Sequence, residues 1–398
     1  MMRGLFSSLR RGSIDKLQNG ASLLQPHIAI SANDAWNLIN FRSGLIAALI
    51  GDGYRIVALA PENPVMADAL RVLGCSFETV PIDSAGASLS RDFATFAAYN
   101  KIFRRLRPSV LLSWTVKPNV YGALAARLNG IKTIPNVSGL GTAFIHLSPL
   151  TIVIQILYKL SCAKARTVFF QNHDDRDLFV LRGLVRLAQT RVLPGSGIDT
   201  VRFTPPPGGR PKARRFVMIA RMLADKGVRE FVAAAQVVRA RYPNARFVLN
   251  GFLDAANRTA ISSDEVEEWM AAGIIEYIPP LSDVRPTIAQ ADFIVLPSYR
   301  EGLSRVLLEA AAMGRPLIAT DVPGCREIVS EGENGFLCAP RDAASLAAAM
   351  FRACAIDDDT WSRMAQASRA RAVDDFEEAK VINQYREALA EGGLSLRC

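Results

Sequence analysis

Residues 293–320 read FIVLPSYREGLSRVLLEAAAMGRPLIAT, and this stretch decides the fold class. The apolar run FIVL predicts a buried strand, SRVLLEAAAM predicts a helix, and PLIAT predicts a second strand. Gly314 and Pro316 are typical of the turn that ends such a helix. Two buried strands joined by a helix indicate a parallel sheet that is covered by helices.

The same alternation continues on both sides of this stretch. Short apolar runs separated by amphipathic segments lie at 27–31, 55–61, 76–82, 110–114, 132–139 and 167–172, and again at 216–220, 246–250 and 274–278. Between the two series lies TPPPGGRPKARR (204–215), whose prolines and glycines predict a linker. We therefore expect an α/β protein with two Rossmann-like, doubly wound domains that face a cleft.

The predicted boundaries divide the chain into five segments. They are a basic tail (1–26), a first domain (27–203), the linker (204–215), a second domain (216–372), and a C-terminal helix with its tail (373–398). The length of 398 residues is too great for one compact core and fits two domains.

Composition excludes several classes of protein. Half of the residues are hydrophobic and the mean hydropathy is +0.15, which is globular rather than disordered. The six cysteines form no CxxC pair and the three histidines have no zinc spacing, so we expect free thiols and no metal site. The start of the chain has no apolar signal-peptide core, and the most apolar stretch, around 145–165, is interrupted by polar residues.

The charge is uneven along the chain. The net charge is +9, and no aspartate or glutamate occurs between Asp92 and Asp174. That span carries Lys101, Arg104, Arg105, Arg107, Lys117, Arg127, Lys132, Lys159, Lys164 and Arg166. A basic face of this kind suits an anionic membrane, a phosphorylated ligand or nucleic acid, or is simply solvated. No nucleic-acid-binding module is recognisable, so we expect no nucleic-acid partner.

Two common nucleotide-binding motifs are missing. The stretch SGLGTAFI (138–145) lacks the third glycine of a dinucleotide fingerprint, and no phosphate-binding P-loop occurs. The acidic run DDRD (174–177) contains a D-x-D pattern, but its place before an apolar run favours the start of a helix over a metal site.

The chemistry of the opening stretch comes from its two glutamates. Glu301 lies on the turn after the first strand, and Glu309 lies inside the helix. The backbone amides of Gly302, Leu303 and Ser304 open that helix and are expected to attract phosphate. Carboxylates accept hydrogen bonds from sugar hydroxyls, so the pattern predicts a ligand with both phosphate and hydroxyl groups, a nucleotide sugar.

Two cations are predicted to serve the phosphates. Arg221 follows the first strand of the second domain and Lys226 comes just before the next helix. A guanidinium fork and an ammonium can together neutralise a diphosphate. We therefore expect no cofactor and no metal requirement.

These motifs resemble those of the retaining glycosyltransferases with the GT-B fold, in the superfamily that includes glycogen synthase and lipopolysaccharide-type enzymes. Glu301 and Glu309 match its pair of glutamates separated by seven residues, and VLPGSGIDTVRFTP (192–205) resembles its interdomain segment. The resemblance implies that Glu301 contacts the donor sugar, Glu309 the ribose, and Arg221 and Lys226 the diphosphate. It also implies that a helix over 376–391 crosses back to the first domain.

The first half resembles a subgroup of bacterial enzymes that extend polyprenyl-diphosphate-linked sugars for capsule, O-antigen or exopolysaccharide. The resemblance rests on NLINFRSGLIAAL (37–49), on TVKPNVYGALAARLNGIKTIPNVSGLGTAFI (115–145) and on FFQNHDDRDLF (169–179). It implies an acceptor-binding first domain with Asn40, Arg42, Lys117, Asn119 and Ser138 among the substrate-binding residues. It further implies a hexose or N-acetylhexosamine donor, with UDP the expected nucleotide, and a cytoplasmic enzyme on the inner leaflet of the plasma membrane.

Two departures from the family pattern concern the acceptor side. The loop ANDAWNLINFRSG (32–44) lacks the glycine pair of many relatives, and Ser138 stands where many have histidine. A soluble or different lipid acceptor, a sugar-nucleotide epimerase and a non-catalytic scaffold remain alternatives, and the sequence gives no oligomeric state.

Overall fold

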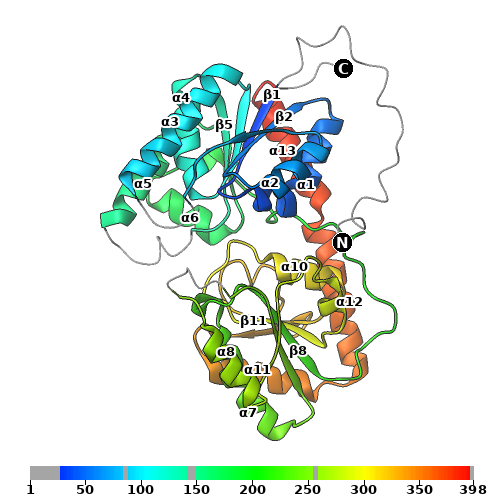
Figure 1. Ribbon diagram of the computed structural model, residues 1–398. Coiled ribbons are helices and arrows are strands. Elements are labelled where there is room, and N and C mark those ends of the chain that lie inside the picture. The colour runs from blue at the N-terminus through cyan, green and yellow to red at the C-terminus, as the bar shows by residue number, and fades with distance from the viewer. Residues whose placement is uncertain (1–26, 84–87, 141–148, 254–258, 395–398) are drawn as a thin grey trace.

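The computed structural model describes residues 27–83, 88–140, 149–253 and 259–394. The predicted basic tail (1–26) and the last four residues lie outside this range. Two parallel sheets covered by helices form two domains, one above the other (Figure 1). This arrangement confirms the predicted fold class.

The first sheet has seven strands in the order β3-β2-β1-β4-β5-β6-β7. The strand β1 pairs in parallel with both β2 and β4. Strands β1 to β3 are therefore added towards one edge of the sheet and β4 to β7 towards the other, and this reversal of strand order lies between β1 and β4. The strands are β1 (His27–Ser31), β2 (Arg55–Ala60), β3 (Ser76–Thr79), β4 (Val110–Trp114), β5 (Lys132–Val137), β6 (Val168–Phe170) and β7 (Thr190–Val192).

The second sheet has six strands in the order β10-β9-β8-β11-β12-β13, and its reversal lies between β8 and β11. Ligands of doubly wound domains bind beyond the carboxyl ends of the strands at such a reversal. The strands are β8 (Arg215–Ile219), β9 (Arg246–Asn250), β10 (Glu276–Ile278), β11 (Phe293–Leu296), β12 (Leu317–Thr320) and β13 (Gly335–Cys338).

Helices cover both faces of each sheet. The first domain has α1 (Ala35–Gly51), α2 (Pro64–Val72), α3 (Leu89–Leu106), the π-helix η1 (Pro118–Gly122), α4 (Ala123–Leu128), α5 (Pro149–Cys162), α6 (His173–Leu181) and the short η3 (Leu187–Gln189). The second has η4 (Ala224–Lys226), α7 (Val228–Arg241), α8 (Ser263–Ala271), α9 (Arg285–Ala289), α10 (Arg305–Ala312), α11 (Ala343–Ala355) and α12 (Asp358–Phe376), and α13 (Glu378–Glu391) ends the chain.

Side-chain caps fix the start of many of these helices by accepting hydrogen bonds from otherwise unbonded amides. The capping residues are Asp34, Asn63, Asn172, Ser262, Ser304, Asp342 and Asp357. The cap of α6 is Asn172, and Asp174 and Asp175 lie in its first turn, so DDRD does begin a helix.

The chain passes between the domains at two adjacent places. Ile198 donates its N–H to the Phe376 carbonyl at 2.8 Å and accepts the Glu378 N–H at 3.0 Å. Ile198 and Phe203 already pack in the core of the second domain, together with Phe376. The first passage therefore lies before Ile198, upstream of the predicted boundary at 203, because these apolar side chains find their core in the second domain.

The C-terminal crossing takes the form of two helices. The predicted helix over 376–391 is interrupted at Glu377, where α12 ends and α13 begins. The helix α12 packs against α10 in the second domain, whereas α13 packs against α1 in the first (Figure 1). Tyr385 on α13 is buried, with its ring centroid 5.8 Å from that of Trp114 and 4.8 Å from that of Phe169. The second passage is thus at 376–378.

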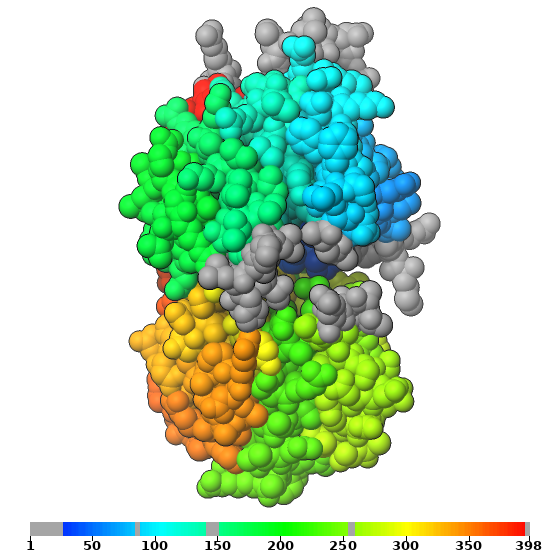
Figure 2. Space-filling model, turned by 90° about the vertical axis from the view of Figure 1, so that its left-hand side faces the viewer, coloured from blue at the N-terminus to red at the C-terminus, as the bar shows by residue number. Residues whose placement is uncertain are grey.

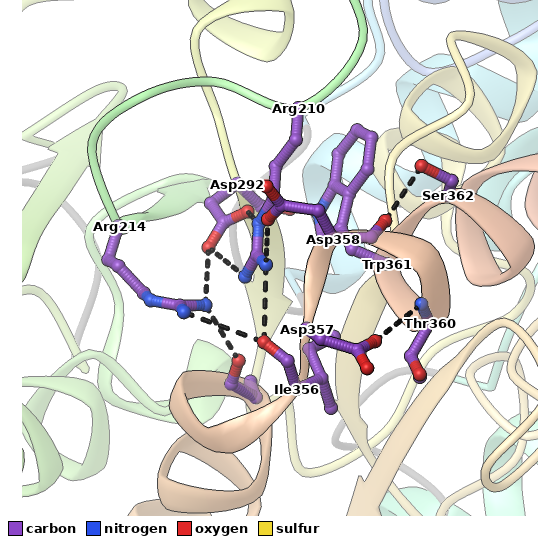
Figure 3. A network of polar contacts seen from close by, with 10 residues as sticks. Arg210, Arg214, Asp292, Ile356, Asp357, Asp358, Thr360, Trp361 and Ser362 are labelled. Carbon is purple, nitrogen blue, oxygen red and sulfur yellow. Dashed lines mark hydrogen bonds and ion pairs between the residues drawn. The ribbon is translucent and has the colours of Figure 1, made fainter.

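The linker is tied to the base of the second domain by arginines (Figure 3). Arg210 donates from Nε to the Asp292 carboxylate at 2.9 Å and from Nη1 to Asp358 at 2.8 Å. Arg214 approaches Asp292 at 3.9 Å. Burial raises the pKa of Asp292, and Arg210 opposes that rise. The second half of the predicted linker is therefore held against the second domain.

No helix within the described ranges is long and apolar enough to cross a bilayer. The five cysteines in the same ranges are all buried and free.

Candidate active site between the domains

The loops after β8 and β11 meet at the reversal of the second sheet. Gly227 has a φ of 78°, and a Cβ there would lie 2.1 Å from the Pro297 carbonyl oxygen, so only glycine allows this approach. Tyr299 donates its N–H to the Asp225 carbonyl at 2.9 Å. The two loops are thereby fixed against each other at the carboxyl edge of the sheet.

This contact brings two of the predicted catalytic residues together. The Lys226 ammonium lies 2.5 Å from Glu301 Oε1, and the two side chains are 22% and 14% exposed. The Glu301 N–H donates to the Pro323 carbonyl at 3.1 Å, which fixes its backbone. A partly buried ion pair within solvent reach can bind a ligand that carries both negative charge and hydroxyl groups.

Arg221, the third predicted catalytic residue, lies in the same loop and is exposed. Its neighbour Met222 donates its N–H to the Phe252 carbonyl at 2.7 Å, so the loop is anchored beside Arg221. Arg221 and Lys226 therefore both lie in the loop that follows β8, at the reversal between β8 and β11.

The predicted phosphate-binding amides are only partly available. The Ser304 N–H donates to the Gly324 carbonyl at 3.0 Å, and its hydroxyl accepts from the Leu307 N–H at the start of α10. The prediction of a phosphate contact from the Ser304 amide is therefore wrong, because that amide already has a protein acceptor. Leu303 lies against Gly195 of the passage between the domains.

Gly302 serves the contact between the domains. A Cβ at Gly302 would lie 2.3 Å from the Ser138 carbonyl oxygen of the first domain. Asn172, also in the first domain, donates from Nδ2 to the Gly302 carbonyl at 2.7 Å. The missing side chain thus lets the first domain reach the backbone beside Glu301, and Ser138 faces the second domain there.

Glu309 lies on α10, and 15% of its side chain is exposed, much as for Glu301. Arg305, one turn earlier, donates from Nε to Glu309 Oε1 at 3.0 Å. Burial raises the pKa of Glu309, whereas the charges of Arg305 and Arg202 lower it. The two glutamates therefore have different cationic partners.

Two predicted substrate-binding residues of the first domain are buried. The Arg42 guanidinium lies 4.9 Å from the Trp114 ring centroid and is 3% exposed, and burial lowers its pKa to about 10. Asn119 is fully buried; it accepts from the Ser113 hydroxyl at 2.8 Å and donates to the Asn136 carbonyl at 2.7 Å. Protein groups enclose both side chains.

Two others are engaged by neighbours. The Lys117 ammonium lies 2.7 Å from the Asp92 carboxylate, which balances its charge. Asn40 is exposed on α1 and donates to the Trp36 carbonyl of its own helix at 3.0 Å. Arg127, one of the basic residues between Asp92 and Asp174, donates to the Leu160 carbonyl at 2.8 Å.

Sequence reasoning missed an ion pair between the domains. Arg300, beside Glu301, pairs with Asp175, whose side chain is fully buried at the start of α6. Burial raises the pKa of Asp175, and Arg300 opposes that rise. The available signal was the acidic run DDRD, which indicates the start of a helix but not a partner in the other domain.

Within the described ranges, no three or more His, Cys, Asp or Glu side chains are grouped to hold a metal ion. On the face seen in Figure 2, the surface is hollowed between the two domains. The predicted donor-binding residues lie on the second-domain side of this division.

Known protein families match both domains. Residues 27–172 match the family described as glycosyl transferase 4-like, and residues 213–355 match glycosyl transferases group 1. An N,N'-diacetylbacillosaminyl-diphospho-undecaprenol alpha-1,3-N-acetylgalactosaminyltransferase from Campylobacter jejuni is 28% identical over 78% of this chain and 84% of its own. An Escherichia coli UDP-Gal:alpha-D-GlcNAc-diphosphoundecaprenol alpha-1,3-galactosyltransferase is 23% identical over 77% of this chain and 82% of its own.

Solved structures agree in fold. HepE from Anabaena in complex with UDP superimposes with a TM-score of 0.74 at 18% identity, over 92% of this chain and all of that one. Sucrose-phosphate synthase from Thermosynechococcus elongatus gives the same TM-score, identity and coverage. With matching families over both domains and the predicted pair of glutamates in place, the chain belongs to the group 1 glycosyltransferases with the GT-B fold.

Proposed function

We propose that this glycosyltransferase transfers a sugar, with retention, from a UDP-linked donor to a polyprenyl-diphosphate-linked saccharide. The observation that carries the proposal is the Lys226–Glu301 pair at the reversal of the second sheet, next to the contact with the first domain. The Escherichia coli relative, whose name gives a UDP donor and a diphosphoundecaprenol acceptor, supports this choice of substrates.

The proposed reaction needs positive charge on the leaving group. The acceptor hydroxyl oxygen bonds to the anomeric carbon as the bond from that carbon to the diphosphate oxygen breaks. The acceptor proton passes to the leaving diphosphate on the same face of the sugar. Negative charge grows on the diphosphate, and Lys226 and Arg221 stabilise it at the transition state. Cations supplied by the chain take the place of a divalent metal in this proposal.

Glu301 has two roles in the same proposal. It orients the sugar by accepting hydrogen bonds from its hydroxyls, and it stabilises positive charge on the sugar ring. Its bond to Lys226 keeps the carboxylate in place before the donor arrives. The first-domain contacts at Gly302 limit the entry of water, which favours transfer over hydrolysis.

A lipid-linked acceptor calls for a membrane-facing surface on the first domain. The helix α5 exposes Ile152, Val153, Ile156 and Leu160, a spacing that places them on one side of the helix. Exposed basic residues lie on and after it, at Lys159, Lys164 and Arg166. An apolar stripe with basic neighbours fits an anionic bilayer surface. We define this stripe with its basic neighbours as the α5 face.

Binding of nucleotide sugars to the purified protein tests the donor side. Thermal unfolding should shift upward with the correct donor, because a ligand that binds only the folded state stabilises it. A panel of UDP-, GDP- and ADP-sugars identifies the nucleotide. No shift with any UDP-sugar would contradict the proposed donor.

The acceptor side is tested by turnover with and without a short-chain polyprenyl-diphosphate-linked saccharide. Donor consumption only in its presence supports transfer, whereas interconversion of the donor sugar without it would indicate an epimerase. Nuclear magnetic resonance of the product distinguishes retention from inversion. EDTA treatment tests the metal-free proposal, which would fail if activity disappeared and Mg²⁺ restored it.

A further inference from the structure

Arg305 lies where α10, the passage between the domains and the first domain meet. Its Nε donates to Glu309 Oε1 at 3.0 Å. Its Nη1 donates to the Gly197 carbonyl at 2.6 Å and lies 3.2 Å from the Ser196 hydroxyl. A single guanidinium therefore joins the Glu309 carboxylate to the segment by which the chain leaves the first domain.

The rings around Arg305 come from both domains. Its guanidinium carbon lies 6.0 Å from the Phe41 ring centroid and 5.9 Å from that of Phe203. Phe41 belongs to α1 of the first domain, and Phe203 packs in the core of the second. The orientation of the guanidinium plane is thereby defined by both domains.

A second carboxylate shares the field of Arg305. Glu378, at the start of α13, packs so closely on α1 that a Cβ at Gly44 would lie 2.1 Å from its Oε2. Burial raises the pKa of Glu378, and the charges of Arg305 and Arg42 oppose that rise. Arg305 thus balances Glu309 in the second domain and Glu378 in the passage to the first.

The backbone at this passage has little freedom. Gly197 has a φ of 70°, and a Cβ there would lie 2.5 Å from the Glu378 Cα. The hydrogen bonds of Ile198 with Phe376 and Glu378 hold the two passages together. Gly197 stands directly before Ile198 at this passage, so a rotation of one domain against the other acts on the Gly197 carbonyl and on the bonds that Arg305 can keep.

We propose that Arg305 is a positioning residue that couples the orientation of the Glu309 carboxylate to the relative rotation of the two domains. The inference rests on the proposed function and on the contact between Glu309 and the donor ribose that the family resemblance implies. Coupling is reciprocal, so ribose binding favours the domain arrangement in which Arg305 keeps all its bonds.

The test compares UDP with 2′,3′-dideoxy-UDP by isothermal titration calorimetry. Arg305→Met and Glu309→Gln should each weaken UDP binding about tenfold, because each removes a hydrogen bond that involves a charged group. The double variant should bind UDP no more weakly than the weaker single variant. Neither change should weaken the binding of dideoxy-UDP, which has no ribose hydroxyls for Glu309.

The hinge side is tested at Ser196, which lies against Arg305. Ser196→Ala should weaken UDP binding roughly threefold in the native background and not at all in Arg305→Met. Arg305→Lys keeps the charge without the guanidinium fork, and its affinity for UDP should lie between those of the native protein and Arg305→Met. It serves as the second variant if Arg305→Met folds poorly. Arg352→Met is the matched control, because Arg352 also pairs with a glutamate and lies over a phenyl ring in the same domain.

Each outcome decides between the claims. Equal losses for UDP and dideoxy-UDP, additive effects of Arg305→Met and Glu309→Gln, or an unaffected Ser196→Ala would overturn the coupling. Native protein that does not bind UDP would overturn the proposed donor instead. If Arg305→Met binds UDP as tightly as the native protein does, only the role of Arg305 is overturned.

Discussion

At the scale of single residues, several charged groups in this protein are buried in pairs. Isolated buried charge is strongly unfavourable, so Lys226 with Glu301 and Arg210 with Asp292 are each stable only because the partner is present. The pairs differ in access to solvent: Asp292 is 1% exposed, whereas Lys226 is 22% exposed. A ligand can therefore bind to Lys226 and Glu301, whereas the buried pair of Arg210 and Asp292 contributes to the stability of the fold.

Lys226→Met should lower kcat/KM for the donor about a hundredfold or more, because removal of one stabilising group from a developing negative charge costs roughly 3–4 kcal/mol. Arg221→Ala should act in the same direction. Steady-state kinetics at varied donor concentration measure the effect. Lys212→Met, an exposed lysine of the linker, is the control, and unchanged kinetics in the Lys226 variant would remove that residue from the site.

Arg210→Met should destabilise the second domain by about 3 kcal/mol at neutral pH, because it leaves the buried Asp292 carboxylate without its main partner. Arg210 opposes the rise in the pKa of Asp292, so its loss raises that pKa further. The pKa of this acid is then higher in the folded state than its unfolded value of about 3.9. Such a group stabilises the fold at pH values below the unfolded pKa, and this contribution is lost as the pH rises through the folded pKa. The penalty should therefore shrink as pH falls.

Urea unfolding at several pH values measures this penalty. Arg229→Met removes a largely exposed pair with Glu265 in the same domain, and it should cost roughly 1 kcal/mol or less. A penalty for Arg210→Met that stays constant from neutral pH to pH near 4 would refute the role given to Asp292.

Residue identity predicts chemistry better than it predicts burial. The pairing of Glu301 with Lys226 was within reach of sequence reasoning, because both residues follow neighbouring strands of one sheet. The burial of Arg42 and Asn119 was not, because it depends on Trp114, Asn136 and the returning α13. The sequence alone does not distinguish an arginine or asparagine that contacts a ligand from one that is buried in the core.

At the scale of elements, the interior strands were predictable, whereas only two of the four edge strands, β3 and β10, were predicted. The interior strands β4 and β9 have the predicted bounds, because their apolar runs are continuous. The edge strands β7 and β13, of three and four residues, were missed. Three or four residues are too few to show a clear hydrophobic pattern in the sequence, so the pairing of these strands is decided by the neighbouring strand.

Val153→Asp on the α5 face should weaken binding to anionic phospholipid vesicles about tenfold, because burial of a valine side chain in the interface contributes roughly 1.5–3 kcal/mol. High salt should weaken native binding too, since the basic neighbours of the stripe are exposed. Vesicle co-sedimentation measures both effects.

Val72→Asp is the matched control, because Val72 is an exposed valine on α2 of the same domain. Equal effects of the two substitutions, or binding that ignores salt, would show that the α5 face does not contact lipid.

At the scale of the whole molecule, the domains are held by contacts in the loop before α10 and at the first residue of α10. Arg300 in the loop pairs with Asp175, and Arg305 donates to the Gly197 carbonyl. Arg300→Met should open the molecule, because Asp175 would stay buried without its cationic partner. Small-angle X-ray scattering should then give a larger radius of gyration.

Asp175→Asn combined with Arg300→Met should restore part of the closed form, because it removes the buried charge. A radius of gyration unchanged in Arg300→Met would show that this ion pair does not hold the domains together.

The return of α13 to the first domain means that the first domain consists of two separate stretches of sequence, one ending near Gly197 and one starting at Glu377. Exchange of first domains between related enzymes therefore cannot succeed with a single junction in the proline-rich linker. Such a chimaera would set one enzyme's α13 against another's α1, where the Gly44–Glu378 contact leaves no room for mismatch. Grafts should instead carry both stretches, with junctions beside Gly197 and Glu377, where the two passages lie together.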